Sequence, residues 1–329
     1  MIVGRWCANG NARAGILAVF FALLPAAHAG AQTIVARVPI PPYAAANVAV
    51  NPRLNKIYLS GGASARPEVY VVDGRTFKAK RIGTGSGVSV DTETGNYWAA
   101  NASGARAIVR KGLDNNEIYR VSTTEGCPLS TTFDNRTRRV WVANQCGKNG
   151  DPVFVFDGDN FGRIAGPIPT GGVMSTAVVS PATGRLYIAP SGISKRIDPE
   201  TFQVTGNAFG IVRAVDPVTG KLFALSGQTL QLINGIHDPE TVSVAINLGY
   251  VPAGIAVDFT LGHIYLSNPA QSSIEIRMIS TGALLNTFTL PGKLIPGSIA
   301  VDTTRGRVYL SATHGPDTLL LAIDNSDMP

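Results

Sequence analysis

One sequence pattern occurs seven times along the chain, and this repetition constrains the fold more than any other feature. Each copy has a short apolar strand, an acidic or polar anchor residue, a tight turn, and a second strand with an aromatic residue seven positions after the anchor. Successive anchors are 36 to 46 residues apart. The anchors with their aromatics are Asn51 with Tyr58, Asp91 with Trp98, Asp134 with Trp141, Ser180 with Tyr187, Asp216 with Phe223, Asp258 with Tyr265, and Asp302 with Tyr309.

The turn in each copy has the composition of a tight β-hairpin. The residue four positions after the anchor is asparagine or glycine in six copies, and these residue types tolerate the positive φ that tight hairpins require. Arg138 is the exception. We expect the anchor side chain to accept hydrogen bonds from turn amides, as Asp and Asn commonly do. The anchors are therefore predicted to be structural and not catalytic.

A second pair of strands lies between the copies, so each unit has four strands. Four-stranded units of about 40–45 residues are typical of β-propeller blades. The sequence therefore predicts an all-β fold in which residues 30–329 form one seven-bladed β-propeller with four antiparallel strands per blade. Only five residues follow Asp324, so the last blade lacks its outer strand. We expect residues 33–40 to supply it and to close the ring, which also removes an exposed edge.

The first 29 residues are typical of a secretory signal peptide. Arg5 and Arg13 precede an apolar run over residues 14–24, and small residues follow it. The run is too short to span a bilayer core of about 30 Å. We expect cleavage after Ala29, or alternatively after Ala31, and a periplasmic or secreted protein with no membrane span. The formal charge of +6 includes no cluster of Lys and Arg, so nucleic acid is a disfavoured partner.

The copies resemble the YVTN-type β-propeller repeats of exported bacterial and archaeal surface proteins. That pattern runs from an apolar strand through a D-x-x-x-G turn into an aromatic-rich strand that ends in Asn. The closing Asn is present as Asn101, Asn144 and Asn268, and the other four copies carry Gly61, Pro190, Ser226 and Ala312. The resemblance covers almost all of the mature chain. It implies the propeller fold but no single function, because related propellers include ligand-binding, adhesion and single-stranded DNA-binding proteins and some enzymes.

Candidate ligand-binding residues map to the face where the loops between strands two and three and between blades gather around the channel mouth. An acidic and Asn-rich ring is how lactonase-like propellers hold a hard divalent cation. The acids here occupy no repeated position, so we predict no cofactor, and a divalent cation remains an open alternative. The mouth candidates are Glu68, Asn101, Glu125, Asn144, Asp151, Asn268, His314 and Asp317.

Arg213 stands three positions before its anchor, where the other copies carry uncharged residues. A charge at that position needs a partner. We favour a local slip that turns Arg213 outward, or an ion pair between blades, over an anion contact near the channel.

The mature chain keeps two cysteines, Cys127 and Cys146. Counting from the turn at residues 135–138 places them opposite each other across the hairpin, at a separation close to that of a disulfide. Since exported proteins mature in oxidising compartments, we predict a disulfide between them.

The sequence favours a non-enzymatic function. It has no G-x-S-x-G nucleophile elbow and no phosphate-binding glycine loop. The leading hypothesis is an exported, monomeric binding module for a protein, glycan or small molecule, with no catalytic residue assigned. The first alternative is a metal-dependent lactonase or lyase at the channel mouth. The second is single-stranded DNA binding, which needs exposed stacking aromatics, whereas the repeated aromatics are expected in the core.

Overall fold

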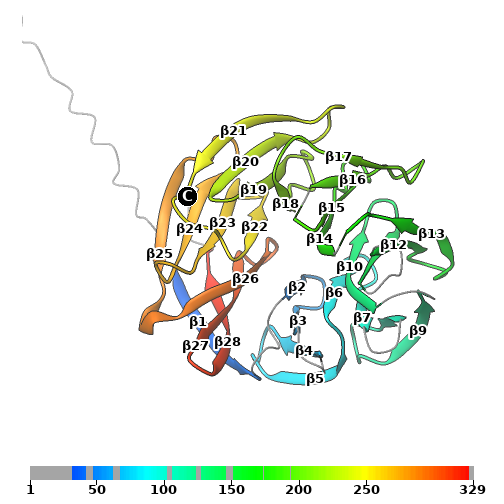
Figure 1. Cartoon of the computed structure of the whole chain (residues 1–329). Helices are drawn as coiled ribbons and strands as arrows, with labels where there is room; N and C mark the ends of the chain where they lie inside the picture. Colours follow the sequence, from blue (N-terminus) through cyan, green and yellow to red (C-terminus); the bar gives the residue numbers. More distant parts are fainter. Residues whose placement is uncertain are drawn as a thin grey trace, which may run out of the picture.

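The structure is a computed structural model that describes residues 32–41, 47–61, 67–101, 106–123, 127–145, 151–172, 174–192 and 194–325. The predicted signal peptide lies outside the described residues. Within them, 28 strands form seven four-stranded antiparallel sheets arranged as the blades of a ring (Figure 1). The predicted seven-bladed β-propeller is therefore confirmed. No helix in the described part of the chain is long and apolar enough to cross a membrane.

The blades follow one another along the chain, each from its innermost to its outermost strand. Blade 1 holds β2 (Asn47–Asn51), β3 (Lys56–Ser60), β4 (Glu68–Asp73) and β5 (Ala79–Thr84); blade 2 holds β6 (Gly87–Val90), β7 (Tyr97–Asn101), β8 (Arg106–Arg110) and β9 (Glu117–Ser122); blade 3 holds β10 (Cys127–Asp134), β11 (Arg139–Gln145), β12 (Pro152–Asp157) and β13 (Arg163–Pro169); blade 4 holds β14 (Met174–Val179), β15 (Leu186–Pro190), β16 (Lys195–Ile197) and β17 (Val204–Gly206). Blade 5 holds β18 (Ile211–Val215), β19 (Leu222–Ser226), β20 (Thr229–Asn234) and β21 (Thr241–Asn247); blade 6 holds β22 (Ile255–Asp258), β23 (His263–Asn268), β24 (Ser273–Met278) and β25 (Leu284–Thr289); blade 7 holds β26 (Ile295–Asp302), β27 (Arg307–His314), β28 (Asp317–Asp324) and β1 (Thr33–Ile40), and the 3-10 helix η2 (Pro291–Lys293) precedes it.

The N-terminal strand closes the ring, as predicted. β1 is the outermost strand of blade 7 and pairs antiparallel with β28, from Thr33 opposite Asp324 to Ile40 opposite Thr318. Figure 1 shows the blue N-terminal strand beside the red C-terminal one. Blade 7 therefore needs both ends of the chain, and the sheet is complete only when they pair.

The repeated aromatics form the core, and each one packs at the boundary with the following blade. All seven rings are at most 1% exposed. Tyr58 of blade 1 packs with Val88 and Val90 of blade 2, and Tyr309 of blade 7 packs with Ile57 of blade 1. The seven core clusters correspond in this way to the seven boundaries between blades.

Six of the seven anchor side chains accept hydrogen bonds from amides of the turns that follow them, as the sequence predicts, whereas the Ser180 hydroxyl has no hydrogen-bond partner among the described residues. Asp91 is 2% exposed, and its Oδ1 accepts hydrogen bonds from the backbone amides of Glu93 (2.9 Å) and Thr94 (3.2 Å). The residue four after the anchor has positive φ in every copy, including Arg138 at +57°. Arg138 therefore adopts the glycine-like conformation although it is not glycine.

A repeated contact between blades joins the residue five positions after the anchor to the next blade. This residue is Lys or Arg in five copies, and its side chain donates to a backbone carbonyl in the turn between the third and fourth strands of the following blade. We call these contacts the inter-blade latches. They run from Lys56 to Leu113 (2.7 Å), Arg139 to Pro199 (2.6 Å), Arg185 to His237 (3.1 Å), Lys221 to Ile279 (3.2 Å) and Arg307 to Gly74 (3.1 Å).

Two boundaries use other contacts, because Asn96 and His263 occupy the latch position there. Between blades 6 and 7, the Asn325 side-chain amide donates to the Tyr265 hydroxyl. Between blades 2 and 3, Arg138 reaches back to the anchor Asp91, as described below.

The Arg307 latch joins blade 7 to blade 1, where the ring closes. Arg307 also lies over the ring of Phe77, with its guanidinium carbon 5.6 Å from the ring centre. We expect Arg307→Met to lower the free energy of unfolding by about 1–2 kcal/mol, because a charge-assisted hydrogen bond is lost. Denaturant unfolding measures this, with Lys78→Met in the exposed part of the same turn as the control. Equal effects of the two substitutions would contradict the prediction.

Candidate functional site

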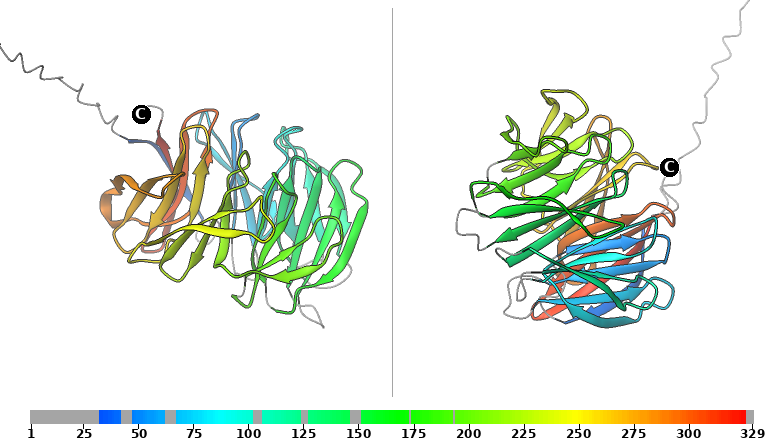
Figure 2. Two further views of the ribbon diagram at one scale, coloured as in Figure 1. Left: turned by 90° about the horizontal axis from the view of Figure 1, so that it is seen from above. Right: turned by 90° about the vertical axis from the view of Figure 1, so that its right-hand side faces the viewer.

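The strands run between two faces of the ring, and the turns gather at these faces (Figure 2). We call the face with the anchor turns and the turns between third and fourth strands the anchor face. The opposite face, with the turns between second and third strands and the connections between blades, is the mouth face. Every candidate loop residue that was predicted from the sequence and that the structure describes belongs to the mouth face.

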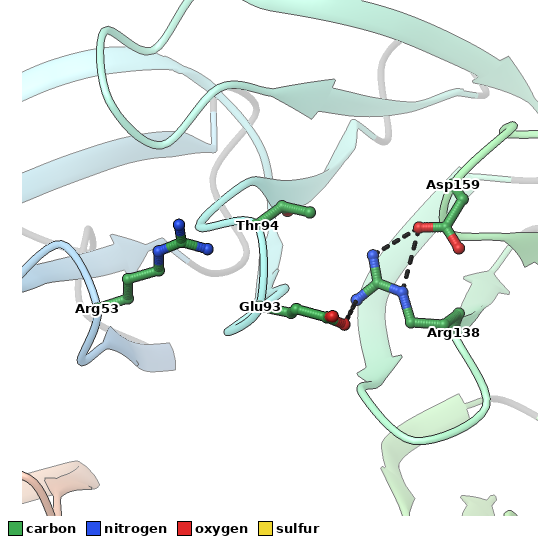
Figure 3. A pocket seen from close by; sticks show the side chains of 5 residues that line it. All are labelled: Arg53, Glu93, Thr94, Arg138 and Asp159. Carbon is green, nitrogen blue, oxygen red and sulfur yellow. Dashed lines mark hydrogen bonds and ion pairs between the residues drawn. The ribbon is translucent and has the colours of Figure 1, made fainter.

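A charged cavity of about 640 Å³ lies on the anchor face between blades 1, 2 and 3. Figure 3 shows Arg138 directed toward Glu93 and Asp159, with Arg53 on the other side of the cavity. Arg138 Nη2 lies 2.6 Å from Asp159 Oδ1, and Nη1 lies 3.3 Å from Glu93 Oε2. The same guanidinium makes a bidentate pair with Asp91, at 2.8 and 2.7 Å. With its donors used in this way, Arg138 joins blade 3 to blade 2.

The Asp91 carboxylate is kept ionised in part by hydrogen bonds from the Arg138 guanidinium. Burial disfavours its ionised form, but hydrogen bonds from Arg138 and from Thr94 and Glu93 outweigh burial and keep the pKa of Asp91 below its ordinary value. The hydrogen bonds to Asp91 and Asp159 raise the pKa of Arg138. The ion pairs of Arg138 in this cavity therefore hold blades 2 and 3 together, and Arg53 is the one lining charge without a partner among the described residues.

Removal of Arg138 leaves a buried carboxylate without its partner. We expect Arg138→Met to reduce the free energy of unfolding at pH 7 by about 3 kcal/mol. Asp159→Asn removes only a partner that is 60% exposed and should cost less than about 1 kcal/mol. Chemical unfolding at pH 7 compares both variants with the wild type.

The loss in the free energy of unfolding caused by Arg138→Met should also depend on pH. A lowered Asp pKa gives stability that is present above the ordinary value of about 3.9 and is lost as the pH falls through the folded-state value. In the variant, Asp91 becomes protonated at higher pH, which relieves the unpaired charge. The difference in the free energy of unfolding between wild type and Arg138→Met should therefore become smaller as the pH falls. A difference that does not change with pH would contradict this prediction.

Most predicted mouth residues have local structural roles. Glu68 begins β4, pairs with Arg81 at 2.7 Å and accepts a hydrogen bond from the Tyr70 hydroxyl at 2.7 Å. Asn268 ends β23 and caps the next turn, since its Oδ1 accepts from the amides of Ala270 (3.1 Å) and Gln271 (3.2 Å).

The Asn and Asp candidates of blades 2 and 3 lie at strand ends. Asn101 ends β7, and Asp151, 5% exposed, precedes β12. Asn144 in β11 is fully buried, and its amide donates to the carbonyls of Val142 and Pro152, each at 3.4 Å. Glu125 lies outside the described residues. The part of the chain that the structure describes contains no group of three or more His, Cys, Asp or Glu side chains placed to hold a metal ion.

The disulfide prediction requires a correction to its geometry. Cys127 pairs with Gln145 across the hairpin, because a bulge between Pro128 and Ser130 shifts the register that holds from Ser130 to the turn. The residue directly opposite Cys127 is therefore Gln145, one position before the predicted one. Cys127 is disulfide-bonded in the structure, and its predicted partner, Cys146, lies outside the described residues.

The pairing of Cys127 with Cys146 therefore stays a prediction. We expect non-reducing peptide mapping of the exported protein to recover one cross-linked peptide pair that contains both residues. Reduction should separate this pair and add two hydrogens to the intact mass. Free thiols at both positions in unreduced protein would contradict the prediction.

The structure supports the local slip expected at Arg213. Across the first hairpin of blade 5, Val212 pairs with Ala224 and Ala214 pairs with Phe223, so Arg213 is the extra residue of a β-bulge. Val212 occupies the buried position that the sequence comparison gave to Arg213, and Arg213 is exposed. The slip turns Arg213 away from the boundary between blades, where Val212 takes its place.

His314 and Asp317 lie together at a second cavity, of about 460 Å³, on the mouth face of blade 7. They flank the turn between β27 and β28. Arg37 and Pro39 of β1 border the cavity beside them, and η2 with Leu294 forms another side. Ring closure therefore builds this cavity, because β1 and the β27–β28 hairpin meet only when the two chain ends pair.

The polar side chains of this cavity differ from those of the anchor face. Arg37, His314 and Asp317 are exposed, and none of the three side chains has a hydrogen bond or ion pair with another described residue. Buried Ile40 and Leu294 and the partly buried Leu319 supply apolar surface between them. Cavities of about 300–1,000 Å³ with apolar walls and a few polar groups are typical ligand sites. This cavity, hereafter the blade 7 cavity, is the best candidate functional site. Sequence reasoning named His314 and Asp317 but missed Arg37.

No family model matches the sequence, and comparison with curated proteins finds no significant match. Solved structures are similar in fold. The β-propeller domain of Cps50 (Swd1) from Myceliophteria thermophila has a TM-score of 0.68 at 12% identity and covers 88% of this chain and 99% of its own. A chain of the mitotic checkpoint complex has a TM-score of 0.68 at 10% identity and covers 89% of this chain and 95% of its own. At these identities the likeness shows the propeller fold alone.

Proposed function

We propose that this chain is an exported binding module that holds a ligand or partner at its mouth face and has no catalytic chemistry of its own. The carrying observation is the blade 7 cavity, where the side chains of Arg37, His314 and Asp317 surround apolar surface and have no hydrogen-bond or ion-pair partner among the described residues. In the anchor-face cavity, by contrast, Arg138 is paired with Asp91, Glu93 and Asp159. Polar groups left unpaired around a cavity are available to a bound molecule.

Two further observations support this proposal. The N-terminal segment of residues 1–29 and the resemblance to YVTN-type repeats favour export to the periplasm or beyond the cell. One similar solved structure is a chain of the mitotic checkpoint complex, a multi-protein assembly, so the propeller fold is compatible with a protein partner. A partner would contact the mouth loops and place one side chain in the blade 7 cavity, whereas a small ligand would occupy the cavity alone.

The test compares native mass spectra of proteins purified from the exported fraction. We expect wild-type protein, beginning near Gly30, to retain a stoichiometric ligand or partner. The Arg37→Ala/His314→Ala variant should lose it at least about tenfold more readily, because charge-assisted contacts disappear. Both side chains are exposed, so stability should change by less than about 0.5 kcal/mol. Arg163→Ala on the exposed outer strand of blade 3 is the matched control.

Three outcomes would contradict the proposal. Equal retention by the double variant would place the binding site elsewhere. A stoichiometric metal ion with activity on a lactone would favour the metal-dependent enzyme instead. A wild-type protein that carries neither ligand nor partner, even after incubation with the exported fraction, would leave the blade 7 cavity without a binding role.

A further inference from the structure

Arg213 lies in the wall of the central channel. The innermost strands β2, β6, β10, β14, β18, β22 and β26 each contact the next around the ring, and β26 contacts β2 (Figure 1). Arg213 is the middle residue of β18. Neighbouring blades cover the two sides of an innermost strand, so an exposed side chain in the middle of such a strand faces the channel.

The bulge in β18 places the guanidinium there. In other blades the residue three before the anchor is directed into the boundary with the preceding blade, as Ile255 and Ile299 are. In blade 5, Val212 fills this place and packs with Tyr187 of blade 4 at 2% exposure. Because Val212 completes the apolar boundary, Arg213 is displaced from the boundary without loss of core packing. Bulges are known to redirect a side chain beside functional sites.

Among the described residues of the innermost strands, no countercharge lies beside Arg213. Apart from it, the charged residues of the innermost strands are the anchors Asp134, Asp258 and Asp302, which cap their turns at the anchor face. Among the described residues, Arg213 has no hydrogen bond or ion pair. Burial lowers the pKa of Arg213, although water still reaches the side chain. Partial burial together with access to water is expected for a side chain on the concave wall of a channel, because protein surrounds the guanidinium on several sides while the channel leaves it open to solvent.

We propose that Arg213 is the primary contact of an anion-binding site inside the channel, and that the site takes a small oxyanion, either a carboxylate or a phosphate. A guanidinium is permanently charged, and its planar fork of donors matches the oxygens of both groups. A partly desolvated charge without a partner gains more from such a ligand than a solvated one does. The site is separate from the blade 7 cavity and does not depend on the function proposed for it.

The test uses isothermal titration calorimetry with inorganic phosphate and, separately, with acetate, at ionic strength held constant with chloride. Wild-type protein should bind at least one of the two anions at one site per chain. Arg213→Gln should raise the dissociation constant at least about tenfold, because the charge is lost. Arg163→Gln, which removes an exposed cation from the outer strand of blade 3, should bind as the wild type does.

Arg213→Lys keeps the charge but loses the planar fork, so its affinity should lie between those of the wild type and Arg213→Gln. Thermal unfolding in chloride alone checks folding, and Arg213→Gln should be no less stable than the wild type because it removes an unpaired charge. Binding of phosphate only would assign a phosphate site, and binding of acetate only a carboxylate site. Failure of the wild type to bind either anion, or unchanged binding by Arg213→Gln, would overturn the proposal.

Discussion

The packing of each aromatic ring against the following blade is the interaction on which the rest of the structure depends. A ring such as Tyr58 is buried only when the next blade is present, so no blade buries its own core alone. In repeat proteins, stability resides largely in such contacts between neighbours. A linear array would leave its last aromatic, Tyr309, uncovered. Closure of the circle, in which β1 completes blade 7 and blade 1 covers Tyr309, follows from this requirement.

The same requirement gives the two faces different roles. At the anchor face, the inter-blade latches join charged side chains to backbone carbonyls of the next blade. Arg138 of blade 3 likewise pairs with Asp91 of blade 2. These side chains contact the neighbouring blade and so hold the blades together. Among the described residues of the mouth face, no charged side chain makes such a contact repeatedly from blade to blade. Arg37, His314 and Asp317 meet there, and a binding function is therefore better accommodated on that side.

Features that repeat in every blade could be predicted from the sequence. The buried aromatics and the capping anchors follow from the sequence pattern of the repeat. The closing strand follows from the number of strands, because the last blade lacks one. The inter-blade latches also repeat, at the fifth position after the anchor, and the Lys and Arg residues there were an available signal that the sequence reasoning missed. The blade 7 cavity could not be predicted in full, because the position of Arg37 depends on the register of β1 against β28.

Counting from the turn misplaces Cys127 and Arg213 for the same physical reason. A capped turn fixes the register of an innermost strand at its anchor end, so residues close to the anchor lie where counting places them. Toward the mouth, bulges interrupt this register, between Pro128 and Ser130 in β10 and at Arg213 in β18. A bulge adds one residue without changing the apolar pattern near the turn, so the sequence alone does not reveal it. In the innermost strands the irregular backbone therefore lies toward the mouth, and it redirects side chains such as Arg213 without disturbing the aromatic packing between blades.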